Sequence, residues 1–370
     1  MAEQIKIGPH TLSGRAILAP MAGLTDQVFR NICRSFGAAL AVSEMSTADT
    51  RLWNSRKSET RLDLAGDNGI KVLQIAGSEP TQLANAARAA TDLGADIVDI
   101  NMGCPAKKVC RKLSGSALLQ DENLVARILE AVVEASALPV TLKMRTGWNP
   151  VNRNGARIAK LAEQIGIAAL AIHGRTRECM FKGNVEFETI RQIKQSVSIP
   201  VFANGDITDI KQAKEVLEYT GADAVMIGRG ALGRPWVFSQ LNLSLSQDLI
   251  DKESGQKITS LPVSISEQRA TILLHLNELH RLYGKERGVR VGRKHLTWYC
   301  KYLDGADEFR NRIVRVDDAE TQLQLTEEFL GQIYSPEEGV EKPALEVDTF
   351  SSGKEHLQKE SEHLRQENRS

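Results

Sequence analysis

Short apolar runs recur through the first two thirds of the chain at the spacing of buried strands. Eight of them lie at residues 16–18, 40–42, 72–75, 97–100, 140–144, 168–172, 201–203 and 224–227. They show little alternation of polar and apolar residues, which is typical of parallel strands covered on both faces. Amphipathic segments between them, such as 81–93, 123–135 and 209–219, predict helices. The pattern predicts an α/β fold, either a (β/α)8 barrel or a doubly wound sheet.

A weak internal repeat favours the barrel. The segments 94–98, 166–170 and 221–225 each place a glycine that can end a helix just before a strand. Between these repeats, Pro139 and Pro200 open two further strands, where no N–H donor to the sheet is needed. Strands that open after a glycine thus alternate along the chain with strands that open with a proline. This regular alternation suits a closed barrel better than a doubly wound sheet, whose strand order reverses at one point. We therefore expect a (β/α)8 TIM barrel over residues 1–245.

The remaining third divides by composition. Residues 246–264 are polar and rich in serine, which predicts a linker. A helical domain is expected over residues 265–334. The last stretch, 335–370, is charged, rich in serine and glutamate and poor in aromatic residues, so we expect it to be disordered or at most a frayed helix.

Bulk composition narrows the class of protein further. Of the 370 residues, 42% are hydrophobic and 25% charged, and the formal net charge is zero, so any attraction to nucleic acid must come from a local patch. Five cysteines with no CxxC pair fit a reducing compartment better than a disulfide framework, and no metal site is expected. No stretch reaches membrane-spanning length. We expect a cytoplasmic monomer, although the sequence does not determine the oligomeric state.

The most informative stretch follows the fourth predicted strand. It reads Asn101-Met102-Gly103-Cys104-Pro105, and the glycine and proline restrict the backbone on both sides of the cysteine. Most free cysteines are buried structural thiols. A polar strand exit usually exposes its side chains, however, and functional residues concentrate on such loops. We therefore favour a functional Cys104.

Polar residues also follow nearly all of the remaining predicted strands. A TIM barrel carries its functional residues at these carboxyl ends of the strands. Lys143 and Arg145 lie at the end of the fifth predicted strand with their side chains on the same side of it. They are either two surface cations or ligands of an anionic ring or a phosphate. His173 is as consistent with a hydrogen-bonded strand-end imidazole as with a functional one. So many polar strand ends are hard to attribute to structure alone.

The loops after the last two strands predict a phosphate site. Gly228-Arg229-Gly230-Ala231-Leu232-Gly233 matches the GxGxxG dinucleotide fingerprint, but that motif also needs an acidic residue about 20 residues on, at the end of another strand. The candidates Asp248 and Asp251 fall in the predicted linker. Barrels commonly bind phosphate with these two loops, here Asn204-Gly205-Asp206 and Gly228-Arg229-Gly230. A phosphorylated ligand is the better interpretation.

A basic segment lies in the predicted helical domain. Residues 281–295 contain a single acid, and the aromatic residues Tyr283, Trp298 and Tyr299 lie in or just beyond it. A solvated helix face is the usual explanation of a charge run. Because the sign is one-sided in a chain of zero net charge, we favour a patch for a nucleic-acid backbone. Its candidate contacts are Arg287, Arg290, Arg293 and Lys294.

Taken together, these motifs resemble the tRNA-dihydrouridine synthases, most closely the bacterial B-type branch. The resemblance covers residues 5–330 and rests on the segments 20–26, 74–77, 101–105, 143–148, 173–175, 204–206 and 228–230. It implies an FMN-dependent reductase of uridine in tRNA that uses NADPH. It also implies roles for single residues. Cys104 would be catalytic, Asn101 would contact the uracil, and Arg145 and Arg175 would lie near the substrate. The implied flavin-binding residues are Pro20, Met21, Ala22, Gln74, Lys143, His173, Asn204, Gly205, Asp206, Gly228 and Arg229.

The chemistry of this reaction fits the residues. Reduction of the uracil C5–C6 bond needs a hydride at C6, supplied by reduced flavin, and a proton at C5. Cys104 has to be a neutral thiol to donate that proton, so its pKa should be normal or raised. Lys143 would stabilise the anionic reduced flavin. The target base is stacked in folded tRNA and must be extruded into the pocket.

Three other functions remain open from the sequence. A related flavin barrel could act on a free pyrimidine, in which case tRNA would not bind in a salt-dependent way. A non-redox barrel could use Lys143 as a Schiff-base lysine, and that protein would be colourless. An RNA-binding module without turnover would be indifferent to loss of Cys104. The sequence determines neither the target uridine nor the preference for NADPH over NADH.

Overall fold

Eight parallel strands close into a ring. Each strand pairs with the next along the chain, and pairing of β4 with β6 and of β3 with β11 completes the circle. The computed structural model describes residues 4–245, 263–301, 303 and 305–333. Its ring strands are β3 (Ala16–Leu18), β4 (Leu40–Val42), β6 (Lys71–Ala76), β7 (Ile97–Met102), β8 (Val140–Arg145), β9 (Ala169–His173), β10 (Val201–Asn204) and β11 (Ala224–Ile227). The predicted TIM barrel is confirmed, with all eight strands where the apolar runs placed them.

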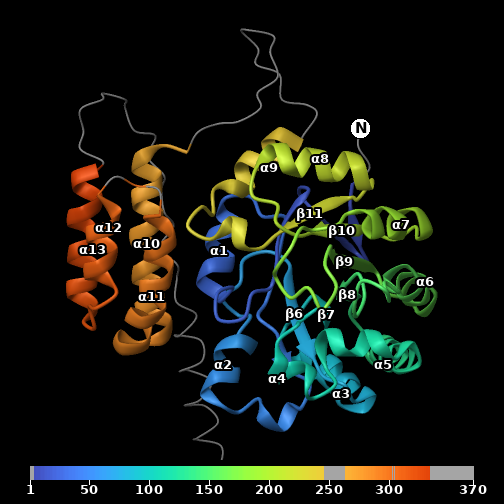
Figure 1. Ribbon diagram of the computed structural model, residues 1–370. Coiled ribbons are helices and arrows are strands. Elements are labelled where there is room, and N and C mark those ends of the chain that lie inside the picture. The colour runs from blue at the N-terminus through green and yellow to red at the C-terminus, as the bar shows by residue number, and fades with distance from the viewer. Residues whose placement is uncertain (1–3, 246–262, 302, 304, 334–370) are drawn as a thin grey trace, which may run out of the picture. The chain divides into compact units, whose positions relative to one another are not determined.

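Helices surround the ring (Figure 1). The main ones are α1 (Gln27–Ser35), α3 (Pro80–Asp92), α5 (Glu122–Ala135), α6 (Gly155–Ile165), α7 (Glu188–Ser196), α8 (Ile210–Thr220) and α9 (Val237–Leu245). Shorter elements lie in the loops: β5 (Ser46–Thr47), η1 (Thr50–Leu52), α2 (Arg56–Leu62), α4 (Lys107–Cys110), η2 (Gly115–Gln120) and η3 (Arg229–Ala231). The turn η3 follows Gly228, so the GxGxxG segment does not open an α-helix directly, as a dinucleotide fingerprint would.

The barrel interior is apolar at its amino end. Side chains from alternate strand positions, such as Ile97, Phe202 and Met226, form one buried cluster there. A hairpin of β1 (Lys6–Ile7) and β2 (His10–Thr11) contributes Ile7 to the same cluster, and Leu12 just after it joins in. Because the hairpin covers the amino ends of the strands, the polar carboxyl ends are left to form a site.

The predicted helical region is also present. It consists of α10 (Ile265–Tyr283), α11 (Lys285–Tyr299), α12 (Ala306–Ile313) and α13 (Ala319–Ile333). Ser264 caps α10 by accepting the N–H of Glu267. The four helices share a core that includes Leu276, Phe309 and Leu330. Most of the predicted linker, and all of the predicted tail from residue 335, lie outside the described residues, so the proposed domain boundaries stay predictions.

Aromatic and imidazole rings join the helical region to the barrel. Phe29 of α1 stacks on His275 of α10 with ring centroids 5.6 Å apart, and His295 of α11 lies 4.3 Å from His275. Tyr283 donates its hydroxyl to Asp26, the N-cap of α1, at 3.1 Å. Tyr283 and Tyr299 are therefore buried. These two aromatic residues of the basic segment and its flank therefore face the protein interior.

The buried histidine pair should make stability depend on pH. Burial lowers the pKa of His295 to about 3, and that of His275 falls well below its usual value for the same reason. Each histidine therefore binds a proton more readily in the unfolded chain, so stability is lost as pH falls below about 6.5. His295 alone should lower the free energy of unfolding by about 1.4 kcal/mol at pH 5.5 relative to pH 8.

Urea denaturation at pH 8 and pH 5.5 measures this loss. The variant His295→Phe is the comparison, because it keeps a ring but cannot titrate. Burial raises the pKa values of Asp26 and Asp99 to about 6, so these two residues make the protein more stable as the pH falls. Their contribution is the same in wild type and variant and cancels when the two pH-dependent changes in stability are subtracted. An equal change between the two pH values in wild type and variant would contradict the prediction.

None of the described helices is both long and apolar enough to cross a membrane.

Candidate active site

Cys104 lies in the loop after β7, and hydrogen bonds hold its backbone from both sides. The Asn101 side-chain oxygen accepts the N–H groups of Gly103 and Cys104 at 3.1 and 3.0 Å. Ser116 donates its N–H and its hydroxyl to the Cys104 carbonyl at 3.1 and 2.9 Å. Gly115 has a φ of 63°, and a Cβ atom on it would lie 2.7 Å from that carbonyl. The half-buried thiol is therefore carried on a fixed backbone, as the sequence predicted.

A chain of buried polar side chains orients Asn101. Its amide nitrogen donates to the Gln74 oxygen at 2.8 Å, and the Gln74 nitrogen donates to Asp99 at 2.7 Å. The Thr141 hydroxyl donates to the other Asp99 oxygen at 2.7 Å. Strand register aligns Gln74, Asp99 and Thr141 on β6, β7 and β8. The chain fixes the Asn101 amide with its oxygen toward the cysteine loop.

Asp99 was not among the predicted site residues. Burial raises its pKa to about 6, against hydrogen bonds from Gln74 and Thr141 that lower it. It is therefore an ionised carboxylate at neutral pH inside the barrel. An acid in the middle of the apolar run 97–100 was a signal for such a role, because a buried carboxylate needs partners.

The environment of Cys104 favours a neutral thiol. Burial raises the pKa of Cys104, while its hydrogen bond with the Ala106 backbone and the cations Arg145 and Lys143 act weakly in the opposite direction. A thiol with a raised pKa keeps its proton at neutral pH and can donate it. A raised pKa is what a cysteine that donates a proton needs, so the expectation of a normal or raised pKa for Cys104 agrees with the structure.

Lys143 is a buried cation with one hydrogen-bond partner. Its Nζ atom donates to the Asn204 side-chain oxygen at 3.1 Å, and Asn204 is held in turn by the Met226 carbonyl. Burial lowers the pKa of Lys143 to about 8, and the negative charge of Asp99 opposes this shift. No described carboxylate forms an ion pair with it. A buried ammonium with donors to spare fits an electron-rich ligand at the carboxyl ends of the strands.

Arg145 and Arg175 hold loops in place. The Arg145 guanidinium donates to the carbonyls of Gly103, Thr176 and Met180 at 2.7 to 2.9 Å. Arg175 likewise donates to the carbonyls of residues 182 and 183 at 3.2 and 2.6 Å. Both side chains therefore shape the mouth of the barrel through the backbone, and their predicted contact with a substrate stays a prediction.

The two predicted phosphate loops meet at Asp206. Its carboxylate accepts Arg175 and Arg229, each at 2.5 Å, and these hydrogen bonds hold the pKa of Asp206 below its usual value. Asp206 has a φ of 45°, in the left-handed region. Arg229 is exposed, and its guanidinium is paired with Asp206 at the edge of these loops. The neighbouring His173 stays neutral, because burial and nearby cations lower its pKa far below the usual value.

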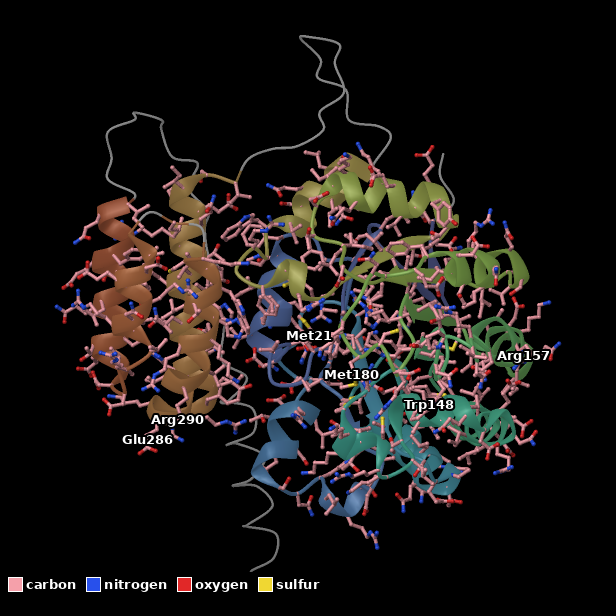
Figure 2. The ribbon with its side chains drawn as sticks, in the orientation of Figure 1. Met21, Trp148, Arg157, Met180, Glu286 and Arg290 are labelled. Carbon is pink, nitrogen blue, oxygen red and sulfur yellow. The ribbon has the colours of Figure 1, made fainter. Side chains whose placement is uncertain are left out.

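The first loop closes the ring of site residues. Met21 donates its N–H to the Thr25 hydroxyl at 2.9 Å, and Gly23 donates to the buried carboxylate of Glu44 at 2.5 Å. A Cβ atom on Gly228 would lie 3.7 Å from the Met21 sulfur, so the loops after β3 and β11 are in contact. Figure 2 shows Met21 and Met180 near the middle of the view.

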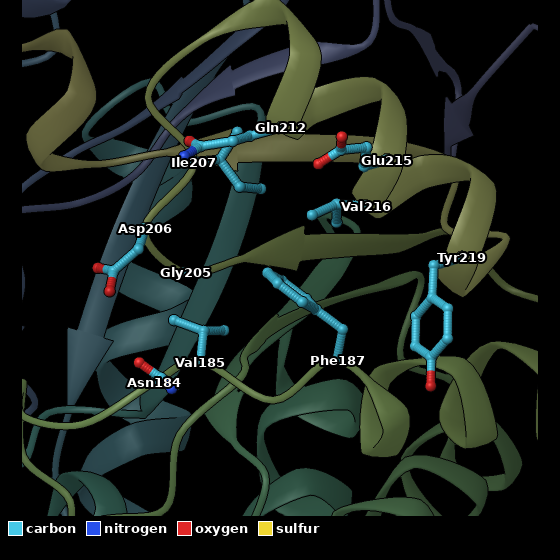
Figure 3. Close-up of a pocket in the computed structure, with 10 residues that line it drawn as sticks. All are labelled: Asn184, Val185, Phe187, Gly205, Asp206, Ile207, Gln212, Glu215, Val216 and Tyr219. Atoms are coloured by element: carbon cyan, nitrogen blue, oxygen red, sulfur yellow. The ribbon is translucent and has the colours of Figure 1, made fainter.

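A surface pocket of about 420 Å³ lies beside the phosphate loops. Gly205 and Asp206 form one side, and helix α8 lines the other with Gln212 and Tyr219 (Figure 3). Neither Cys104 nor Lys143 contributes to it. The pocket is therefore a different place on the protein from the site formed by Cys104 and Lys143. Among the described residues, no group of three or more His, Cys, Asp or Glu side chains is placed to hold a metal ion.

The four basic residues predicted to contact a nucleic-acid backbone differ in surroundings. Arg290 and Lys294 are exposed, with Arg290 at the lower end of α11 in Figure 2. Arg287 is half-buried and its guanidinium lies 4.5 Å from the Tyr283 ring centre. Arg293 instead donates to the Val316 carbonyl and ties α11 to the turn before α13. This contact gives Arg293 a structural function, and its contact with a nucleic-acid backbone stays a prediction.

The fold and the site define a (β/α)8 barrel enzyme with a fixed thiol and a buried lysine at the carboxyl ends of its strands. A model of the dihydrouridine synthase (Dus) family matches residues 17–334. A tRNA-dihydrouridine synthase B from Pseudomonas aeruginosa is 53% identical over 328 residues, which cover 89% of this chain and 96% of that one. Proteins of the same name from Shewanella oneidensis (51% over 331 residues, 89% and 99% covered) and Proteus vulgaris (50% over 325 residues, 88% and 98% covered) are similar. The chain belongs to the dihydrouridine synthase family.

Proposed function

We propose that this protein reduces uridine to 5,6-dihydrouridine in tRNA, with FMN as its bound cofactor and NADPH as the electron donor. Family membership over residues 17–334 supports the reaction. The observation that carries the proposal is the half-buried Cys104, held by Asn101 and Ser116, with its pKa raised by burial. Such a thiol suits proton donation to C5 of the uracil ring. Its substrate would place the enzyme in the cytoplasm, and we propose that it acts as a monomer.

The residues present fit a flavin. Lys143 offers a buried positive charge with spare donors, which suits the N1/O2 edge of the ring system. The glycine loops and Arg229 suit the phosphate. When bound, the flavin would supply the hydride for C6. The proposed cofactor residues are Pro20, Met21, Ala22, Gln74, Lys143, His173, Asn204, Gly205, Asp206, Gly228 and Arg229.

The substrate would be held by residues on both parts of the chain. Asn101 uses its oxygen for the cysteine loop and one N–H for Gln74, which leaves its second N–H for the uracil. Arg145 and Arg175 would shape the pocket around the extruded base. Arg287, Arg290, Arg293 and Lys294 would lie along the tRNA backbone, and such contacts make binding salt-dependent.

The test begins with the visible absorption spectrum of the purified protein. Flavin bands that bleach on anaerobic addition of NADPH, and return when unmodified tRNA is added with formation of dihydrouridine, are the expected result. Reoxidation by free uracil but not by tRNA would favour a pyrimidine reductase instead. No flavin after reconstitution with FMN would contradict the redox proposal and direct attention to Lys143 as a Schiff-base lysine.

A further inference from the structure

A cluster of exposed cations lies on the same loop as Cys104. Lys107, Lys108, Arg111 and Lys112 occupy α4 and the turn that follows it, and all four side chains are exposed. We call these four residues the loop cations. No described acidic side chain forms an ion pair with any of them. Asp49, whose pKa the charge of Lys112 lowers in small part, is already bonded to Arg51 at 2.8 Å.

The turn that carries the loop cations is rigidly attached. At its amino end, Ser116 and the Cys110 thiol both contact the Cys104 carbonyl, at 2.9 and 3.7 Å. At its carboxyl end, the Ser78 hydroxyl donates to the Lys112 carbonyl and the Ser114 hydroxyl to the Gly77 carbonyl, each at 3.0 Å. The cations and the thiol therefore sit on one fixed segment, three to eight residues apart in sequence.

We propose that the loop cations bind the phosphates on either side of the target uridine in tRNA. This inference rests on the proposed function, because the substrate must bring C5 of an extruded uridine to Cys104. The flanking phosphates are covalently attached to that nucleotide, so they must pass close to the loop that carries the thiol. Four unpaired cations there match the charge of an RNA backbone.

The loop cations would thus act together with α11, which carries Arg290 and Lys294, but at a different place on the tRNA. In Figure 1, α4 lies at the barrel, whereas α11 belongs to the group of helices α10 to α13. Contacts on α11 would hold the body of the tRNA. Contacts on the cysteine loop would hold the nucleotides next to the extruded uridine. Loss of these contacts should weaken tRNA binding without changing the reaction with NADPH.

The experiment compares two double variants of the full-length flavin-loaded protein. Lys107→Gln with Lys108→Gln removes two loop cations. Lys160→Gln with Lys214→Gln removes the same charge from exposed positions on α6 and α8. For each protein, the dissociation constant for unmodified tRNA is measured across a salt series, and the KM for NADPH is measured separately. Binding is read without turnover, so it does not depend on dihydrouridine formation.

The loop variant should bind tRNA roughly tenfold more weakly at low salt, in line with the loss of two phosphate contacts. The slope of log affinity against log salt should fall by about 1.4 to 1.8. The α6/α8 variant should match wild type in both, and the KM for NADPH should be the same in all three proteins.

Two results would overturn the proposal while leaving the proposed function standing. One is tRNA binding by the loop variant that equals that of the α6/α8 variant. The other is a raised KM for NADPH with normal tRNA binding, which would assign the loop cations to the phosphates of the nicotinamide nucleotide. Wild-type protein that forms no salt-dependent complex with tRNA would overturn the inference and the proposed function together.

Discussion

Replacing Cys104 with alanine should nearly abolish dihydrouridine formation while the protein still binds flavin and still reacts with NADPH. The thiol is the proposed source of the proton at C5, and burial keeps it neutral by raising its pKa. A positioned general acid contributes about 10²- to 10⁴-fold to the rate, and a loss of that size is expected in Cys104→Ala. The measurement is a single turnover of the NADPH-reduced protein with unmodified tRNA, followed by quantification of dihydrouridine.

Cys110→Ala is the matched control for this prediction. Cys110 lies on the same loop, and its thiol contacts the Cys104 carbonyl at 3.7 Å, so the variant tests whether a nearby thiol deletion alone disturbs the loop. It should keep most of the activity, because Ser116 still holds that carbonyl with two hydrogen bonds. Normal turnover by Cys104→Ala, with flavin bound, would remove the cysteine from the mechanism.

The strands of the barrel could be predicted because both of their faces are buried. Each therefore appears in the sequence as a mostly apolar run, and the polar residues at and just beyond its end mark the carboxyl end. Lys143 illustrates the principle, since an ionisable residue near the end of such a run has few structural explanations. The same logic placed Cys104 in a loop. Neither inference required knowledge of which strands are neighbours.

What could not be predicted depends on neighbouring strands and helix faces. The chain from Asp99 through Gln74 to Asn101 joins residues that are 25 and 27 positions apart, and it exists only because β6 and β7 pair in register. Which side chains of the basic segment face the solvent could not be predicted for a related reason. A count of charges ignores the helical period, which turns Tyr283 and His295 inward.

Asp99→Asn should slow dihydrouridine formation and move the alkaline limit of activity to lower pH. An asparagine can accept only one of the two hydrogen bonds that Asp99 now receives from Gln74 and Thr141. The Gln74 amide, and through it Asn101, would lose their fixed orientation. Small displacements of a catalytic group can cost on the order of 10²-fold in rate, and we expect a loss of about 10- to 100-fold in kcat.

The pH effect has a separate cause. Burial lowers the pKa of Lys143 to about 8, and the negative charge of Asp99 is the main influence that opposes the shift. Removing that charge lowers the pKa of Lys143 further, so the ammonium is lost at a lower pH as the solution is made more alkaline. Activity that requires a positive Lys143 should therefore decline earlier in Asp99→Asn, as measured by kcat between pH 6.5 and 9.

Thr141→Val separates the two causes. It removes the hydrogen bond at 2.7 Å from Thr141 to Asp99 but keeps the carboxylate and its charge. Its kcat should fall by less than that of Asp99→Asn, and its alkaline limit should stay where it is in the wild type. If the limit instead moves in Thr141→Val and not in Asp99→Asn, the group that titrates there is not Lys143. The buried lysine would then serve the flavin by its hydrogen bonds and not by its charge.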